Sequence, residues 1–195
     1  MIYKDLGIPL RASNVGEADK IYTILTKTNG KIQSVAKGVR KIQSRKRGNI
    51  EIGTLSSLTL YKGRTLYTLT ECEMLDYFEH IRDFIGIKFI FEILRICDKF
   101  ANTQQSCEFL FDHSVSTLKI ADQYPGKLSV IKPWFRLHVA QFESTFEENP
   151  QLDERFQLLL KIFLNKSLED IFRVNITSQT LERLESYSIN SLSIK

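Results

Sequence analysis

The chain contains few cysteines, and none of them stands in a pattern that binds metal or forms disulfides. Cys72, Cys97 and Cys107 are odd in number, and no two of them have CxxC spacing. A closed zinc site needs closely spaced ligands, and a disulfide framework needs paired cysteines. We therefore expect no metal and no cofactor, and we interpret these residues as buried free thiols in a reducing compartment.

Long apolar runs are also absent. No stretch approaches the ~18–20 apolar residues that cross a bilayer. The first residues, MIYKDLGIPLR, lack the apolar core of a signal peptide and the character of a transit peptide. These absences favour a soluble, cytoplasmic protein.

The sequence lacks the usual catalytic patterns as well. It has no nucleophile elbow, and its glycines do not have P-loop spacing. Glu71, Glu73 and Asp76 follow one another at the end of a predicted strand, which is one hypothesis for a metal-dependent nuclease. No histidine or further acid lies nearby in the sequence to complete such a site. We therefore predict that the protein is not an enzyme.

One segment has no acidic residue at all. Residues 29–48, NGKIQSVAKGVRKIQSRKRG, contain seven basic residues and three glycines. The basic residues are Lys31, Lys37, Arg40, Lys41, Arg45, Lys46 and Arg47. A flexible basic loop that projects from a β-hairpin follows a phosphate backbone without reading its sequence. A solvated surface loop is the alternative, but the lack of any compensating acid favours a nucleic-acid contact.

The excess positive charge lies in the first part of the chain. The net charge of the 195 residues is +4. Residues 1–80 contain 13 Lys and Arg against 8 Asp and Glu, and the remainder contains 14 against 15. We therefore expect the site for a polyanion in the first part, and packing or protein contacts in the rest.

The first 78 residues have the pattern of short strands joined by tight turns. Alternating or continuous apolar residues predict strands over 2–10, 20–26, 31–37, 52–61 and 65–72. Asn29-Gly30 predicts a two-residue hairpin turn in which both residues have positive φ. Five short strands make too little sheet for a sandwich, so we predict closure into an OB-type barrel over residues 1–78.

Residues 79–195 have helical periodicity instead. The segment 81–101 has one narrow polar stripe, which predicts a helix that is nearly surrounded by other helices. Asn149-Pro150 predicts the start of a later helix. Ser167, and either Thr177 or Ser178, predict the caps of two short final helices. The fold class is therefore α+β: a five-stranded OB-type barrel followed by an all-α helical domain.

A second basic turn is predicted between the last two strands. Lys62 and Arg64 flank Gly63 there, and they could join the basic segment on one face of the barrel. Tyr61, Tyr67 and Tyr22 lie on neighbouring strands. If they are exposed, they could stack on bases at about 1–3 kcal/mol each; if they are buried, they belong to the barrel core.

Residues 7–75 contain an ordered series of motifs: GIPLR, GEADKIYTILT, NGKIQSVAKGVR, SRKRG and YKGRTLYTLTECE. This series resembles the amino-terminal domain of the RecO family of bacterial recombination mediators. Each piece alone is weak, but their order is specific. The helical remainder is similar to the family only in pattern. The resemblance implies an OB-fold followed by a helical domain.

The resemblance also implies a function and partners. It implies a non-catalytic mediator that binds single- and double-stranded DNA, anneals complementary strands and helps to load RecA onto gaps covered by single-stranded-DNA-binding protein (SSB). RecR and the acidic carboxy-terminal tail of SSB are the implied partners, and the implied location is the nucleoid. Lys37, Arg40, Lys41, Arg45 and Arg47 match the family's basic loop, and Lys62 and Arg64 match its hairpin. The SSB tail is expected on the helical domain, where we select Lys132 and Trp134.

The sequence departs from the family in one respect. Many members insert a cysteine-rich zinc module after the segment equivalent to residues 149–152. Here no cysteine follows Cys107, so the chain resembles a short form without the metal. An OB-fold protein that binds RNA or the ribosome remains the alternative hypothesis.

Overall fold

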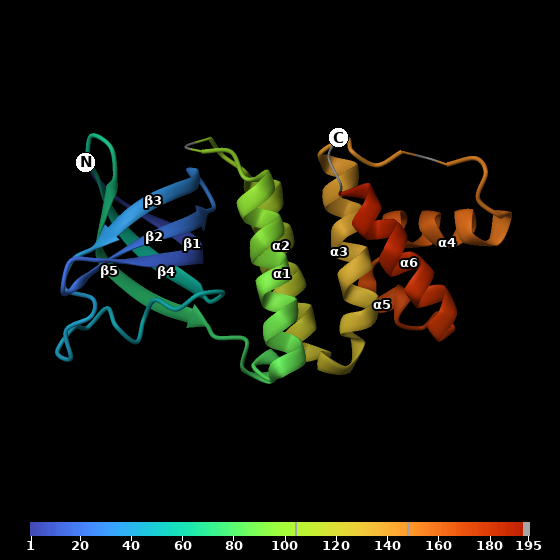
Figure 1. The fold of residues 1–195 in the computed structure, drawn as a ribbon, viewed down its shortest axis with the longest axis horizontal. Helices are drawn as coiled ribbons and strands as arrows, with labels where there is room; N and C mark the ends of the chain where they lie inside the picture. Colours follow the sequence, from blue (N-terminus) through green and yellow to red (C-terminus); the bar gives the residue numbers. More distant parts are fainter. Residues whose placement is uncertain (104, 148, 193–195) are drawn as a thin grey trace. The chain divides into compact units, whose positions relative to one another are not determined.

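The computed structural model describes residues 1–103, 105–147 and 149–192. The chain forms two compact units, Met1–Asp122 and Gln123–Lys195 (Figure 1). The first unit contains all the strands and two long helices. The predicted boundary between the barrel domain and the helical domain, after residue 78, stays a prediction. The last strand of the barrel ends at Asp76.

The strands form a closed barrel in the order β1-β2-β3-β5-β4 (Figure 1). Their bounds are β1 Ile2–Val15, β2 Asp19–Thr26, β3 Gly30–Ala36, β4 Leu55–Lys62 and β5 Tyr67–Asp76. All neighbours are antiparallel except β3 and β5, which are parallel. The predicted OB-type barrel and the α+β class are therefore confirmed.

Strand β1 is longer than the segment 2–10 that we predicted. Its first half pairs with β4 and its second half pairs with β2, and the register shifts between Pro9 and Arg11. A bulge of this kind bends a strand and increases its twist. One long bent strand can therefore belong to both sides of the barrel and close it.

The turn between β2 and β3 differs from the predicted type. Thr26 pairs with Gly30, so residues 27–29 form a three-residue loop, and Gly30 alone in this turn has positive φ, at 62°. A tight turn followed by a left-handed glycine is the next most common hairpin connection. The Thr26 hydroxyl stabilises it by accepting from Asn29 N at 3.1 Å and donating to Gly30 O at 2.9 Å. The hairpin is confirmed, and the two-residue type is wrong.

The rest of the chain is helical, as predicted. The helices are α1 Phe84–Phe100, α2 Glu108–Gln123, α3 Leu128–Phe142, α4 Glu154–Asn165, α5 Leu168–Ile171 and α6 Ser178–Ser191, with short 3-10 helices at Glu79–Ile81 and Pro125–Lys127. Ser167 caps α5 as expected, and Thr177, one of the two residues that we considered, caps α6. No helix within the described ranges is long and apolar enough to cross a membrane.

Helix α4 begins later than we predicted. Asp153 is its cap, because its carboxylate accepts from Phe156 N at 3.0 Å. Asn149 instead forms a local turn, in which its side-chain oxygen accepts from Gln151 N at 3.0 Å. The Asn-Pro pair therefore marks a turn before the helix.

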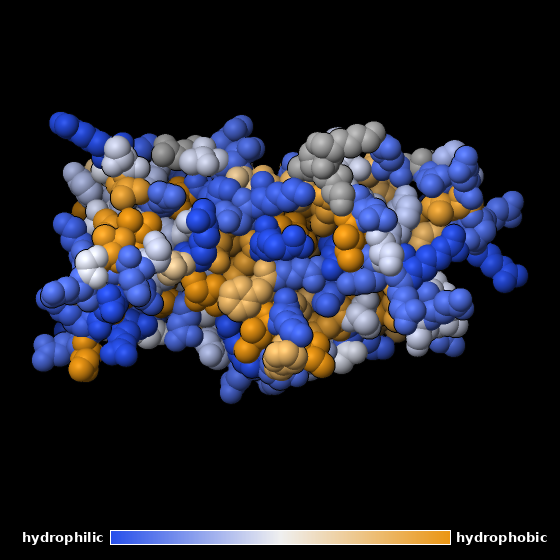
Figure 2. Space-filling view, in the orientation of Figure 1, coloured by the Kyte–Doolittle hydropathy of each residue, from blue (hydrophilic) through white to orange (hydrophobic). Residues whose placement is uncertain are grey.

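Helix α1 is less enclosed than we predicted. Phe89, Ile93 and Cys97 are buried, but Phe84 and Phe91 are 74% and 56% exposed. Figure 2 shows hydrophobic residues gathered on the surface over this helix. The expectation that other helices nearly surround α1 is therefore wrong. The helix has apolar residues on most of its circumference, but only one side of it is buried.

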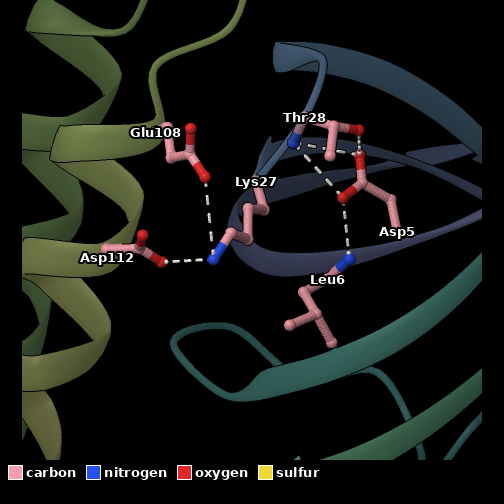
Figure 3. Close-up of polar contacts among 6 residues, drawn as sticks. All are labelled: Asp5, Leu6, Lys27, Thr28, Glu108 and Asp112. Atoms are coloured by element: carbon pink, nitrogen blue, oxygen red, sulfur yellow. Dashed lines mark hydrogen bonds and ion pairs between the residues drawn. The ribbon is translucent and has the colours of Figure 1, made fainter.

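Polar contacts attach the β2–β3 turn to helix α2 and to strand β1. Lys27 Nζ lies 3.1 Å from Asp112 Oδ1 and 3.8 Å from Glu108 Oε1 (Figure 3). Asp5 is buried and accepts from the Thr28 hydroxyl at 2.6 Å. This end of the barrel is therefore held against the helices of the first unit.

We predict that Gly30→Ala is much more destabilising than Gly16→Ala. Both glycines have positive φ, 62° and 56°, so both substitutions strain the backbone by about 1 kcal/mol. A Cβ at Gly30 would also overlap the Gln105 carbonyl oxygen, whereas a Cβ at Gly16 would meet no atom within 4 Å. Urea unfolding should therefore show an additional loss of about 2 kcal/mol or more for Gly30→Ala. Equal losses for the two variants would contradict the close approach of this turn to the α1–α2 connection.

Candidate nucleic-acid interface

The basic segment forms the connection between β3 and β4, which we call the basic loop (residues 37–54). These strands are not neighbours in the barrel, so the loop crosses an end of the barrel and does not project from a hairpin as we predicted. Val39 and Ile50 are each only 3% exposed and belong to the barrel core. The loop therefore closes the barrel at this end.

Tight turns and hydrogen bonds order the basic loop. Within it, amides donate to carbonyl oxygens three residues earlier, as from Lys41 to Gly38 at 3.1 Å and from Arg47 to Ser44 at 3.1 Å. Gly38 N donates to Asp19 Oδ1 at 2.7 Å, which ties the loop to the start of β2. The expectation of a flexible loop is therefore wrong, because hydrogen bonds within the loop and to β2 hold it in a folded conformation.

Most cations of the basic loop point into solvent. Lys37, Arg40, Lys41, Arg45 and Arg47 are exposed. In the described parts of the chain, none of them forms an ion pair with a carboxylate. Arg40 Nη1 donates to Gly16 O at 3.2 Å. The charge of this loop is therefore available to a polyanion.

Two predicted contacts, Lys31 and Lys46, have a different environment. Lys31 is at the far end of β3, where Nζ lies 3.3 Å from Asp98 Oδ1 and also donates to the Asp98 carbonyl oxygen. Lys46 is half-buried, and its Nζ donates to Leu69 O at 3.3 Å. Lys31 is neutralised by a helix carboxylate, and Lys46 holds the loop to β5.

The β4–β5 turn contributes the second group of cations. Lys62 and Arg64 are exposed, and Gly63 N donates to Leu66 O at 3.2 Å to close the turn. In Figure 1 this turn and the beginning of the basic loop lie on the side of the barrel away from α1 and α2, whereas the end of the loop reaches the segment before α1, where Arg82 donates to Gly53 O at 3.2 Å. Figure 2 shows hydrophilic surface over the basic loop.

The three tyrosines separate into core and surface. Tyr22 and Tyr67 are each 3% exposed and belong to the barrel core. Tyr61 is 47% exposed, so it is the one of the three whose ring is open to a base. Burial next to Cys72 and Glu51 raises the pKa of the Tyr22 hydroxyl, with desolvation as the main cause.

The three acids of β5 do not come together as a metal site. Asp76 Oδ1 accepts from Phe78 N at 3.0 Å, and Glu71 Oε2 accepts from the Thr59 hydroxyl at 3.4 Å. Among the residues whose placement is described, no group of three or more His, Cys, Asp and Glu could hold a metal ion. Within the described residues, Glu71, Glu73 and Asp76 therefore belong to no cluster that could hold a metal ion.

The predicted peptide contacts lie on α3, in the second unit. Lys132 is half-buried, and Trp134 is only 8% exposed, with its ring centroid 4.3 Å from that of His138. Burial lowers the pKa of His138, although its bond to Phe163 O acts in the opposite direction. Trp134 is therefore a core residue that offers little surface to a partner.

A groove of about 510 Å³ lies elsewhere in the second unit. Apolar side chains provide much of its lining, including Phe146, Leu160 and Leu164. Lys161 contributes a cation, and Asn149 and Gln157 contribute amides. A cation beside an apolar groove is the arrangement that we expected for the SSB tail at Lys132 and Trp134.

Sequence reasoning missed a cleft beside the basic loop. It has a volume of about 660 Å³ and lies between strands β1 and β2 and the loop. Lys20 and Asn14 line it from the strands, and Glu51 lines it from the loop. The alternation of Lys20 with Tyr22 places both on one face of β2, but only the register of β1 with β2 and the path of the loop bring these residues together.

A closed five-stranded barrel with exposed cations at one end defines an OB-type domain of the kind that binds polynucleotides. The family model described as "Recombination protein O N terminal" matches residues 1–78. Residues 1–78 are therefore similar to the amino-terminal domain of recombination protein O.

Curated relatives support the same assignment. A protein named DNA repair protein RecO from Heliobacterium modesticaldum is 30% identical over 128 residues, which are 65% of this chain and 46% of the relative. The protein of that name from Bifidobacterium longum subsp. infantis is 34% identical over 53% of this chain and 44% of its own length. That from Frankia casuarinae is 43% identical over 38% and 30%. The chain is thus similar to RecO proteins, and the matches span less than half the length of these relatives.

We predict that Cys72 reacts slowly with iodoacetamide at neutral pH. Burial raises the pKa of this thiol to about 11, more strongly than nearby Lys46 lowers it. The folded protein should therefore be alkylated at Cys72 about tenfold faster for each pH unit up to about 11, whereas in urea the rate should level off near the ordinary pKa of about 8.5. Because only the unfolded thiol ionises between these values, this group lowers stability as pH rises through that window. Peptide mass spectrometry measures the rate. Equal rates in the folded and the urea-unfolded protein would contradict the burial of Cys72 next to Lys46 of the loop.

Proposed function

We propose that the barrel binds DNA through its basic loop and that the protein acts in DNA repair and recombination without catalysing a reaction. The observation that carries the proposal is a set of exposed cations, held on a folded loop and not paired with carboxylates in the described ranges. Relatives named DNA repair protein RecO support the process. The RecO amino-terminal domain supports the fold in which binding occurs.

The proposed contact is with the phosphate backbone. Lys37, Lys41, Arg45 and Arg47 are exposed, and Lys62 and Arg64 extend the positive surface on the same side of the barrel. Cations that neutralise phosphates release counterions, which provides affinity without sequence preference. Binding of both single strands and duplexes follows from such a contact.

We also propose that the protein anneals complementary strands and helps RecA to replace SSB on single-stranded gaps. Neutralised strands repel each other less, so a protein that coats phosphates with cations favours their pairing. RecR and the SSB tail are the proposed partners, on the basis of the resemblance to RecO. SSB-coated complementary strands should anneal faster when the protein is added.

We predict that replacing Lys41, Arg45 and Arg47 together with Ala weakens DNA binding to all sequences about equally. The slope of log affinity against log salt concentration should fall by about 0.7 for each lost contact with a single-stranded phosphate. Fluorescence anisotropy with labelled oligonucleotides at several salt concentrations measures both effects. The matched control replaces three exposed cations on α1 and α2, Lys88, Arg95 and Lys119, and removes the same charge.

Two outcomes would contradict the proposal. If the loop variant and the control variant lost affinity equally, net charge and not the loop would control binding. If RNA competed for the wild-type protein much more strongly than DNA of the same sequence, the RNA-binding alternative would replace DNA repair.

For the SSB tail we propose the groove that contains Lys161 in place of Trp134. An acidic peptide that ends in an apolar residue needs a cation beside an apolar surface. The groove offers Lys161 next to Leu160, Leu164 and Phe146. Its volume of about 510 Å³ is within the usual range of about 300–1,000 Å³ for small-ligand sites.

We predict that Lys161→Glu weakens binding of an acidic, Phe-ended peptide by at least about tenfold, because a like charge replaces the attraction. Lys166→Glu is the matched control, since Lys166 is exposed at the end of the same helix and does not line the groove. Isothermal titration calorimetry with the peptide measures the affinity. If Lys132→Glu had the larger effect, the site would be on α3 and not at this groove.

A further inference from the structure

The cleft beside the basic loop has the dimensions of a site for one small ligand. Its volume is about 660 Å³, whereas ligand sites usually measure about 300–1,000 Å³. One wall is formed by Ala12 and Asn14 on β1 together with Lys20 on β2, and the other by the basic loop. A duplex cannot enter a space of this size, but one nucleotide can.

The rim of the cleft is positive. Lys20, Arg40 and Arg47 line it, and none of the three forms an ion pair with a carboxylate in the described parts of the chain. The bond from Arg40 Nη1 to Gly16 O, at 3.2 Å, holds one guanidinium near the turn between β1 and β2. A phosphate at this rim would therefore meet cations from both walls.

The floor of the cleft is apolar. Ala12 and the half-buried Ile52 line it with apolar side chains, and the core residues Val39, Ile50 and Tyr22, each only 3% exposed, back it. A nucleobase has an apolar face that gains free energy on such a surface. The cleft thus offers an apolar floor for a base next to a cationic rim for its phosphate.

Two polar side chains complete the lining. Asn14 supplies an amide, and Glu51 supplies the only carboxylate among the lining residues. A carboxylate close to a bound phosphate repels it unless the ligand also provides a donor. The amino group of a base is such a donor, and Glu accepts from the cytosine amino group in known base contacts.

From these features we propose that the cleft holds a single unstacked nucleotide of a DNA strand. The phosphate lies at the rim formed by Lys20, Arg40 and Arg47, the base lies on the floor, and its amino group donates to Glu51. This inference rests on the proposed DNA binding by the basic loop and goes beyond it. The loop binds backbone of any form, whereas the cleft selects a base that has left its stack.

The selection has a simple energetic origin. Removing a base from a duplex costs a few kcal/mol of unpairing and unstacking free energy, and a base in a single strand costs least. The cleft therefore adds affinity for single strands but not for an intact duplex. A protein with both surfaces holds duplex DNA by its loop and prefers the single-stranded part of a gap.

The test fills the cleft without changing its charge. Ala12 is exposed on β1 and lines the cleft, so Ala12→Leu occupies the space of the base. Ser13→Leu is the matched control, because Ser13 is the next residue and faces the opposite side of the strand. Single-stranded oligonucleotides that contain 2-aminopurine report unstacking as a rise in fluorescence.

We expect wild type and Ser13→Leu to raise the fluorescence of the bound oligonucleotide, and Ala12→Leu not to raise it. Ala12→Leu should also lose about tenfold in affinity for the single strand, the effect of one stacked base, and should bind duplex as wild type does. Unchanged single-strand affinity and fluorescence in Ala12→Leu would overturn the inference. If wild type bound no DNA at all, the proposed function would be overturned instead. The two failures are therefore distinguishable.

A second measurement does not depend on the folding of Ala12→Leu. Wild type should bind oligo(dC) several-fold more tightly than oligo(dT), and Glu51→Gln should remove the difference. If wild type bound oligo(dC) and oligo(dT) equally, Glu51 would not contact the base. Free dCMP should suppress the fluorescence rise only at high concentration; if it bound more tightly than the oligonucleotide, the cleft would be a site for free nucleotides and not for a strand.

Discussion

The structure depends on two apolar side chains that the basic loop places in the barrel. Val39 and Ile50 complete the core at one end, and each is almost fully buried. Burial of a side chain of this size stabilises a fold by about 1.5–3 kcal/mol. The loop cannot leave the barrel without exposing them. The same residues therefore hold the barrel closed and give the cations between them fixed positions.

The two ends of the barrel differ in charge because their cations have different neighbours. At the end that packs on α1 and α2, Lys27 pairs with Asp112 and Glu108. Lys31 and Arg11 both pair with Asp98 there. At the other end, the cations of the basic loop have no such partners in the described parts of the chain. Ion pairs on one side thus attach the helices of the first unit, and the unpaired charge remains on the side where a polyanion can approach.

Much of this could be predicted from the sequence, because strand alternation and the order of turns are local properties. The barrel, the hairpin at Asn29-Gly30 and the caps at Ser167 and Thr177 follow from such patterns. What could not be predicted depends on distant contacts. The pairing of Lys31 with Asp98 joins residues 67 positions apart, and the cleft forms only because the loop returns across the barrel to face Lys20. Local pattern also misled us at Asn149-Pro150, where Asp153 is the better cap for α4.

An ordered loop changes the energetics of the DNA binding that we propose. A flexible basic segment loses conformational freedom when it follows a strand, and that loss reduces its affinity. In this barrel, the turns and the attachment of Gly38 to Asp19 order the loop before any ligand is present. More of the free energy from counterion release is then retained as affinity. Order in the loop also fixes one wall of the cleft, so the surface that we propose for the DNA backbone and the site that we propose for an unstacked base depend on the same folded segment.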